Sequence, residues 1–243
     1  MLCVAKRVAV PTNSYRRGDF RALRTAAPHS RIPRVQDQYI RPEQRNLSIV
    51  WKRQENLANV LSGCGALAQS KYLERHNAAF KVLFFYMCRA LNLVETVPPW
   101  FSKTEPKLTY ESKDAQAFWD VPVYADHTFV SANRVDARFV KHVTKQVILA
   151  EISCPWLENR EKKEAEKTKK YGPLCFELAR GYPGCKIIQL NVIIDVLGGW
   201  SKDVEAQMRK IFGVRTKDVL KRMQKAVISG SLNIARMFKV RVI

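Results

Sequence analysis

The sequence predicts an α+β (α/β) fold: a mixed sheet flanked by helices, with a disordered basic amino-terminal arm and a helical carboxyl-terminal segment. Three stretches are rich in β-branched and other apolar residues, as buried strands are, namely 135–140, 146–152 and 186–196. A charged stretch with helical periodicity, 156–180, separates the second strand from the third. Apolar residues at helical spacing also occupy 54–93 and 202–238, so helices are expected before and after the strands.

The overall charge predicts a polyanionic partner. The 243 residues carry a formal net charge of +20, with 42 Lys and Arg against 22 Asp and Glu. Such an excess favours binding to phosphates, because neutralising them releases counterions. DNA, and possibly RNA, is the first partner to consider, although ribosomal, chromatin and membrane-surface proteins share this composition.

The cysteines and the apolar runs exclude two classes of protein. The six cysteines form no CxxC motif, and a chain of this length needs no disulfide framework, so reduced thiols in an intracellular compartment are expected. The apolar run at 81–93 is shorter than the roughly 20 residues that span a bilayer, and it contains Arg89. We therefore expect a soluble protein with no membrane partner.

Four segments are predicted along the chain: a flexible basic arm, a helical segment, a central core and carboxyl-terminal helices, over residues 1–53, 54–100, 101–200 and 201–243. The arm is rich in Arg, poor in acids and interrupted by four prolines. A mitochondrial transit peptide has a similar composition, but no clear amphipathic helix emerges. Nuclear or cytoplasmic localisation is therefore preferred over mitochondrial.

The helical segment is divided by Gly63 and Gly65 and ends before Pro98 and Pro99. The core begins with two short strand candidates, 107–110 and 121–124, separated by a polar stretch that is compatible with one helical turn.

The strands 135–140 and 146–152 follow, joined by a turn near residues 142–145. Pro155 is placed at the first helical position of the helix that ends at Gly181. After the strand 186–196, Ser201 is a plausible N-cap. The carboxyl-terminal helices are expected at 202–212, 217–227 and 231–238.

Two acidic residues on neighbouring strands suggest a metal site. Asp136 lies at the start of one strand and Glu151 at the end of the next, and the short loop makes these strands hairpin neighbours. With the backbone carbonyl of Ile152 they could hold Mg²⁺ (or Mn²⁺), which takes carboxylate oxygens together with water and phosphate. Such a cation activates water for phosphodiester hydrolysis. Lone acids at strand ends are usually solvated, so this alternative stays open.

The helix after Glu151 offers candidate lysines. One broad stripe carries apolar residues at its carboxyl-terminal end, which turn the stripe towards the core, and basic residues with a tyrosine before them: Lys163, Lys167, Lys170, Tyr171, Leu174 and Leu178. A lysine pointing at the carboxylates would position the attacking water and stabilise negative charge. The spacing leaves open which of the three lysines does so.

Four runs together resemble the restriction-like endonuclease domain at the carboxyl end of site-specific non-LTR retrotransposon polyproteins. They are Arg134-Val-Asp136, Glu151-Ile-Ser-Cys-Pro155, Glu166-Lys-Thr-Lys-Lys-Tyr171 and Lys186-Ile-Ile-Gln-Leu-Asn-Val-Ile-Ile-Asp195. That domain is a divergent PD-(D/E)XK nuclease, here without its reverse transcriptase. The resemblance extends from about residue 72 to the end, and includes Arg75-His76-Asn77.

The resemblance implies a restriction-endonuclease-like sheet and a set of site residues. It assigns Asp136 and Glu151 to the metal, and Lys167 or Lys170 together with Tyr171 to the assisting positions. Two positions depart from the generic motif: Val135 replaces the proline before the first acid, and Ser153 stands where the generic motif has its lysine. The retrotransposon branch shares the second departure, with a helix lysine as the substitute.

Such proteins carry a zinc knuckle upstream of the nuclease domain, and only a remnant of it is visible here. Asn59 stands at the expected histidine, and Cys64 has no cysteine pair before it. A structural zinc site needs four ligands, so no zinc is predicted. The alternative is a metal held by Cys64 and His76.

The sequence thus suggests a Mg²⁺-dependent endonuclease that nicks DNA, with no small-molecule cofactor. An alternative is a catalytically inactive, nucleic-acid-binding remnant of a retrotransposon protein. A third is a retrotransposon fragment with no selected role. The oligomeric state does not follow from the sequence.

Overall fold

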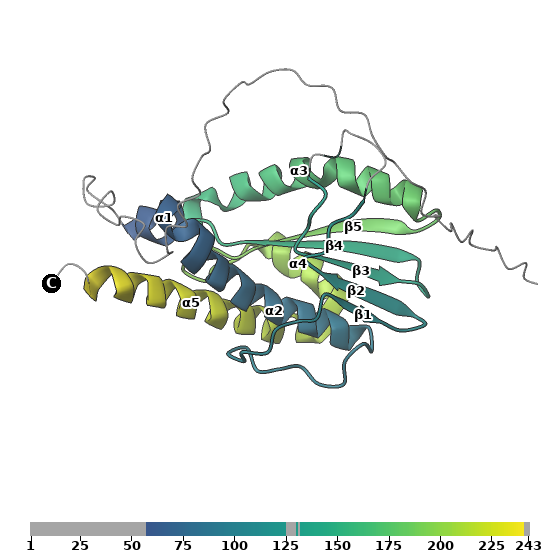
Figure 1. The fold of residues 1–243 in the computed structure, drawn as a ribbon, viewed down its shortest axis with the longest axis horizontal. Coiled ribbons are helices and arrows are strands. Elements are labelled where there is room, and N and C mark those ends of the chain that lie inside the picture. The colour runs from purple at the N-terminus through teal and green to yellow at the C-terminus, as the bar shows by residue number, and fades with distance from the viewer. Residues whose placement is uncertain (1–56, 125–129, 131, 241–243) are drawn as a thin grey trace, which may run out of the picture. The chain divides into compact units, whose positions relative to one another are not determined.

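The computed structural model describes residues 57–124, 130 and 132–240 (Figure 1). These residues form an α+β fold in which a five-stranded mixed sheet is flanked by helices, as predicted. The predicted arm over residues 1–53 lies outside the described residues.

The sheet follows the order of the chain. Its strands are β1 (Thr109–Glu111), β2 (Ala115–Trp119), β3 (Ala137–Lys141), β4 (Gln146–Ser153) and β5 (Lys186–Ile193). The pairs β1/β2, β2/β3 and β3/β4 are antiparallel, whereas β4/β5 is parallel. The parallel pair needs a long crossover, because its strands run in the same direction, and the helix between β4 and β5 supplies it.

One part of the strand prediction was wrong. The stretch between the two short strand candidates forms β2 rather than a helical turn, and residues 121–124 are not a strand. Ala115 and Ala117 face the core and are almost fully buried. Along β2 they alternate with Gln116 and Phe118. The strand was missed because alanine is small and contributes only weakly to a hydrophobic pattern in the sequence.

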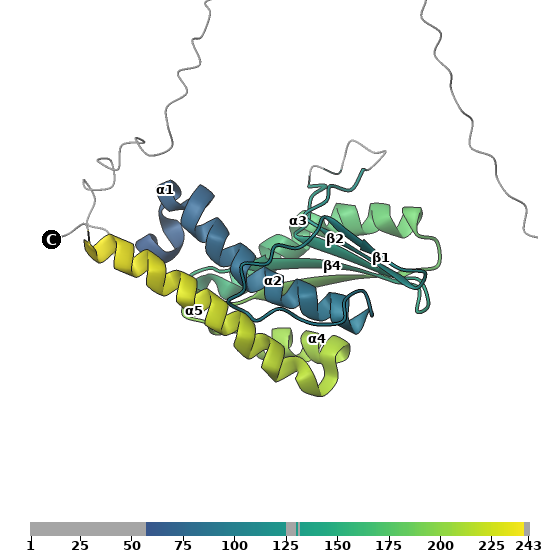
Figure 2. The ribbon, with the colours of Figure 1, turned by 60° about the horizontal axis from the view of Figure 1, so that its bottom comes forward.

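Four helices of eleven or more residues cover the sheet. They are α2 (Leu73–Ala90), α3 (Arg160–Gly181), α4 (Lys202–Phe212) and α5 (Thr216–Val240). Helix α3 lies on one face, and α2, α4 and α5 lie on the other (Figures 1 and 2). Before α2 come a short helix, α1 (Gly65–Leu67), and two wide helical turns, Asn59–Gly63 and Ala68–Tyr72. No described helix is both long and apolar enough to cross a membrane.

Strand β4 lies at the centre of the core and contributes to both of its layers. Ile148, Ala150 and Ile152 pack with α2, α4 and α5, while Leu149 packs with the buried residues of α3. Alternate residues of a strand face opposite sides of a sheet, so Glu151 points to the same face as Leu149. That face carries α3.

The prediction for the start of α3 was also wrong. The helix begins at Arg160, after a 3₁₀ turn over Leu157–Asn159, and not at Pro155. The carbonyl of Pro155 accepts a hydrogen bond from the backbone N–H of Val196 at 2.9 Å. Pro155 therefore bonds to the segment that follows β5, beyond the end of β4, and is not the first residue of the helix.

Helix α5 is continuous through residues 228–230, where two separate helices were predicted. Gly230 lies inside it, and a Cβ on Gly230 would meet Cβ and Cγ of Arg75 at 2.7 Å. The glycine therefore permits the close approach of α2, and it does not end the helix. Ser201 caps α4 as predicted, accepting from the N–H of Val204 at 3.2 Å.

Candidate functional site

The β3/β4 hairpin brings Asp136 and Glu151 together, as the short loop predicted. The register pairs Ala137 with Ala150, so the next pair outward is Asp136 and Glu151. The backbone N–H of Asp136 donates to Oε1 of Glu151 at 3.3 Å. In the other direction, the backbone N–H of Ile152 donates to Oδ2 of Asp136 at 2.8 Å. Each carboxylate is thus held by the backbone of the opposite strand.

The carbonyl of Ile152 points to the same edge of β4 as its N–H group. In an extended strand the two groups of one residue face the same neighbouring strand. The N–H of Ile152 faces Asp136, whereas the carbonyl of Ser153 faces β5 and accepts from Ile194. The strand therefore directs an oxygen of Ile152 towards the two carboxylates.

Lys167 is the lysine that contacts the acids. Its Nζ lies 2.7 Å from Oε2 of Glu151, whose side chain is only 2% exposed. Helix α3 points Lys167 inward because Tyr171, Leu174 and Leu178 on the same stripe are buried against the sheet. The inward direction of the stripe is confirmed for Lys167, Tyr171, Leu174 and Leu178, but not for Lys163 and Lys170.

The other two candidate lysines have different partners. Nζ of Lys170 donates to the Tyr171 hydroxyl at 3.0 Å and lies 4.7 Å from the centre of its ring. Lys163 is paired with Glu166, one turn further along the exposed side of α3. The Tyr171 hydroxyl donates to the carbonyl of Arg134 at 3.2 Å, which ties α3 to the segment that carries Asp136.

His76 was not predicted to lie at the two acids, yet its ring contacts one of them. Nε2 of His76 donates to Oδ2 of Asp136 at 3.1 Å, from helix α2 on the opposite side of the sheet from Lys167. The only signal was its place in the Arg75-His76-Asn77 stretch included in the resemblance. The tertiary contact spans sixty residues, and no local pattern encodes it.

The partners of His76 determine its charge. Nδ1 lies 2.9 Å from Oδ1 of Asn77, and Nε2 faces the carboxylate of Asp136. A carboxylate oxygen can only accept, so Nε2 donates to Asp136, and this contact favours the protonated, charged form of the ring. Burial lowers the pKa of His76, but the hydrogen bond and charge of Asp136 outweigh burial, and the pKa lies above its usual value.

The pKa values of the two acids are shifted in opposite directions. Burial raises the pKa of Asp136, but His76, the Ile152 N–H and Lys167 together hold that pKa below its usual value. Burial and the neighbouring Asp136 raise the pKa of Glu151 more than Lys167 lowers it. Burial, followed by the closeness of Glu151, also raises the pKa of the Tyr171 hydroxyl. Two unlike carboxyls at one site are typical of acid–base and metal chemistry.

Two amides on β5, the half-buried Gln189 and the buried Asn191, hold α3 in place at Lys167, and sequence reasoning overlooked them. Nε2 of Gln189 donates to the carbonyl of Lys167 at 2.9 Å, and Nδ2 of Asn191 donates to Oγ1 of Thr168 at 2.9 Å. Asn191 is the register partner of Glu151 on β5. In the sequence, Gln189 and Asn191 are two polar residues within an otherwise apolar strand. That interruption is the sequence signal that could have pointed to them.

The segment around Cys64, which was predicted to be a knuckle remnant, is organised around a tyrosine. The Tyr72 hydroxyl accepts from the N–H of Cys64 at 3.0 Å and lies 2.7 Å from the carbonyl of Val60. Cys64 is buried in this turn, while His76 is directed at Asp136. Among the residues that the structure describes, no group of three or more His, Cys, Asp and Glu side chains is arranged to hold a metal ion.

Comparison with known proteins adds no identification: no protein-family model matches the chain, and no curated protein is significantly similar to it.

Proposed function

We propose that the protein is a Mg²⁺-dependent endonuclease that nicks DNA, related to the restriction-like domains of non-LTR retrotransposons. The observation that carries the proposal is the contact of Lys167 with Glu151 beside Asp136. Two acids from adjacent strands and a lysine from the following helix are the groups that phosphodiester hydrolysis needs.

The oxygen donors fit a hard divalent cation. Carboxylates of Asp136 and Glu151 and the carbonyl of Ile152 would supply up to three protein ligands to Mg²⁺ or Mn²⁺, leaving the remaining positions to water and phosphate oxygens. When bound, the cation would lower the pKa of a water molecule and neutralise phosphate charge. All three donors come from the end of a single hairpin, which supports their use together.

The surrounding side chains have distinct roles in this proposal. Lys167 would orient the attacking water and stabilise negative charge on the phosphate, since its ammonium group already lies at the Glu151 carboxylate. His76 would be a positioning residue that fixes Asp136. Tyr171 would hold the Arg134 carbonyl and, with it, the start of β3.

A DNA substrate accords with the formal net charge of +20. The proposed localisation is nuclear or cytoplasmic rather than mitochondrial, because the basic arm has no clear amphipathic helix of the kind found in transit peptides.

The proposal is tested by nicking of supercoiled plasmid with the full chain. Conversion to the open circle should need Mg²⁺ or Mn²⁺ and should fall by at least about a hundredfold in Asp136→Ala and Glu151→Ala, because each loses a metal ligand. Lys163→Ala is the matched control, because its ion pair with Glu166 lies outside the site. Nicking that persists in Asp136→Ala would refute the proposal.

One observation favours the alternative, a nucleic-acid-binding protein without turnover. Both carboxylates already have a cationic partner: His76 for Asp136 and Lys167 for Glu151. A metal ion would have to compete with these two ion pairs. In this second proposal the four groups stabilise the fold, and the basic surface alone binds DNA or RNA.

The two proposals differ in a single binding experiment. Calorimetric titration with Mn²⁺ should give one site that is lost in Asp136→Asn if the protein is a metal-dependent nuclease. Steeply salt-dependent DNA binding, with no Mn²⁺ site and no nicking, would establish the alternative.

A further inference from the structure

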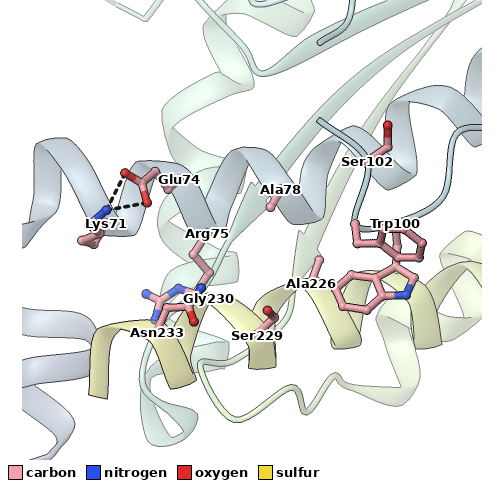
Figure 3. Close-up of a pocket in the computed structure, with 11 residues that line it drawn as sticks. Lys71, Glu74, Arg75, Ala78, Trp100, Ser102, Ala226, Ser229, Gly230 and Asn233 are labelled. Carbon is pink, nitrogen blue, oxygen red and sulfur yellow. Dashed lines mark hydrogen bonds and ion pairs between the residues drawn. The ribbon is translucent and has the colours of Figure 1, made fainter. Parts of the chain in front are cut away.

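A second surface, on the other side of α2, has the features of a ligand site. Two cavities of about 300 and 330 Å³ lie along α5, the first between α2 and α5 (Figure 3), and they share Trp100, Ser229 and Asn233 as lining residues. They therefore form one groove, which we call the α2/α5 groove. None of the residues that line it belongs to the Asp136 and Glu151 site.

One end of the groove is aromatic. Trp100 and Phe101 pack edge to face with ring centres 5.6 Å apart, and Phe101 is 70% exposed. The two rings follow Pro98 and Pro99, which restrict the backbone before them. Ser102 closes the turn by donating its N–H to the carbonyl of Pro99 at 2.8 Å. An exposed ring on a stiff turn is costly to leave in water and is available for stacking.

The other end has a buried positive charge that no carboxylate of the described residues neutralises. Arg75 is 2% exposed; Nη1 donates to the Ser231 hydroxyl at 3.1 Å and its guanidinium lies 5.1 Å from the ring centre of Tyr72. Its Nε has no hydrogen-bond partner among the described residues. Buried charges normally have a counter-ion, so this one favours an anion nearby.

Residues of helix α5 leave room for the side chain of Arg75 and bind it. Its aliphatic stem passes over Gly230, where any Cβ would come within 2.7 Å of it, and its head reaches towards α5 (Figure 3). The Ser231 hydroxyl, which accepts from Arg75, donates in turn to the carbonyl of Val196 at 2.6 Å. Arg75 is therefore a fixed wall of the groove and not a surface side chain that happens to point inward.

The rim of the groove is also basic. Lys225 and Arg236 line its second part, both are exposed, and neither forms an ion pair with a described residue. Lys71 is balanced by Glu74 at 2.8 Å, the one acid among the lining residues (Figure 3). The groove thus carries an excess of positive charge next to two aromatic rings.

We propose that the α2/α5 groove binds single-stranded nucleic acid, with a base stacked on the exposed ring of Phe101, which Trp100 supports edge to face, and the backbone phosphates along Lys225, Arg236 and the field of Arg75. A base can stack on a protein ring only if its own face is free. In a duplex the bases are already paired and stacked on one another, so a single strand is the better ligand. Successive cations beside the rings fit a charged, repeating backbone better than a single small anion.

The proposed function and this inference share only the expectation that the partner is a nucleic acid. Arg75 and His76 are neighbours on α2, but Arg75 is directed at Ser231 of α5 and His76 at Asp136 of the sheet. Binding in the groove therefore needs neither Mg²⁺ nor the carboxylates, and it can be measured in EDTA.

The first test is fluorescence anisotropy with a labelled 20-nucleotide oligo-thymidylate, in EDTA, with the full chain. Phe101→Ala should weaken binding roughly 5- to 150-fold, the range found for the loss of one base-stacking ring. Phe176→Ala is the matched control, since Phe176 is 69% exposed but lies on α3. Equal affinities of the two variants would overturn the proposal.

The second test concerns the rim cations. The double variant Lys225→Ala/Arg236→Ala should reduce the slope of log K against log salt by about 1.4, from about 0.7 for each lost contact with a single strand. Lys217→Ala/Lys221→Ala removes the same charge from exposed positions of α5 outside the groove, and it should leave the slope almost unchanged. An equal reduction in both double variants would mean unspecific attraction and would contradict the proposal.

Two further comparisons identify the strand. Comparing the affinities for oligo-thymidylate and oligo-uridylate shows whether the chain prefers DNA or RNA. A preference that is lost in Phe101→Ala would support binding in the groove and identify the kind of strand. A duplex of equal length should bind without sensitivity to Phe101→Ala. Phe101→Ala should weaken oligonucleotide binding in EDTA but keep the Mn²⁺ site of the unaltered chain, so the two proposals can fail separately.

Discussion

His76 and Asp136 form a hydrogen-bonded ion pair across 3.1 Å that joins helix α2 to the first residue before β3. Nε2 of His76 donates to the carboxylate, and this contact favours the positively charged form of the ring. Both side chains are less than a quarter exposed, so water screens the pair only in part.

Replacing His76 by Gln should lower the free energy of unfolding by about 1.5–3 kcal/mol near pH 5.5, the usual cost of losing a hydrogen bond to a charged group. Urea unfolding provides the measurement. A cycle with Asp136→Asn isolates the pair, because the two single effects should not add. Additive effects would show that the two groups do not interact.

The contribution of this pair should depend on pH in a defined direction. The pKa of His76 is raised on folding, so its share of stability is present below the unfolded pKa of about 6.5 and is lost as the pH rises through the folded value. The pKa of Asp136 is lowered, so its share is present above about 3.9 and is lost as the pH falls through the folded value. The difference in Tm between the unaltered chain and His76→Gln should therefore be largest between these limits and shrink on both sides.

Lys167→Met should be more harmful than the same change at Lys163. It leaves the carboxylate of Glu151 buried without its cation, which costs about 3–5 kcal/mol, and it should abolish any nicking. Lys163→Met removes an ion pair between partly exposed side chains and should change stability by less than about 1 kcal/mol. Glu151→Gln should rescue the stability of Lys167→Met but not its activity, and a fully active Lys167→Met would contradict the assignment of this lysine.

Gly230→Ala should destabilise the protein by about 1–3 kcal/mol, although alanine is the better helix former, because the new Cβ would overlap the stem of Arg75. Thermal unfolding measures this. Gly181→Ala is the control, since a Cβ there meets nothing within 4 Å, and it should be neutral or slightly stabilising. In an Arg75→Ala background the penalty at Gly230 should largely disappear, and a penalty that persists would show that the contact with Arg75 is not its cause.

Cys88 should be inert in the native protein. It is fully buried in α2, and burial raises the pKa of its thiol to about 12, so at pH 8 only about one molecule in 10,000 carries the thiolate. Iodoacetamide labelling followed by mass spectrometry should modify the half-buried Cys185 in the native protein, and Cys88 only after unfolding in urea. Rapid native labelling of Cys88 would contradict the packing of α2 on the sheet.

Much of the fold follows from local sequence patterns. The apolar runs of β4 and β5 and the periodic stripe of α3 are signals of burial that need no knowledge of neighbours. Gly198 and Gly199 lie in the turn that follows β5, which ends at Ile193, whereas Gly230 lies within helix α5. A glycine has the same signal in both cases, and only the partner helix reveals that one of them makes room for Arg75.

The sequence by itself determined the sheet of β3, β4 and β5, the hairpin that pairs Asp136 with Glu151, and the inward stripe of α3, because each depends on residues close in the chain. Only the tertiary structure decided that Lys167 is the lysine at Glu151, that His76 is the partner of Asp136, and that Arg75 is buried beside Gly230. Those contacts join residues 16, 60 and more than 150 positions apart. They depend on how whole elements pack, which no periodicity within one element can specify.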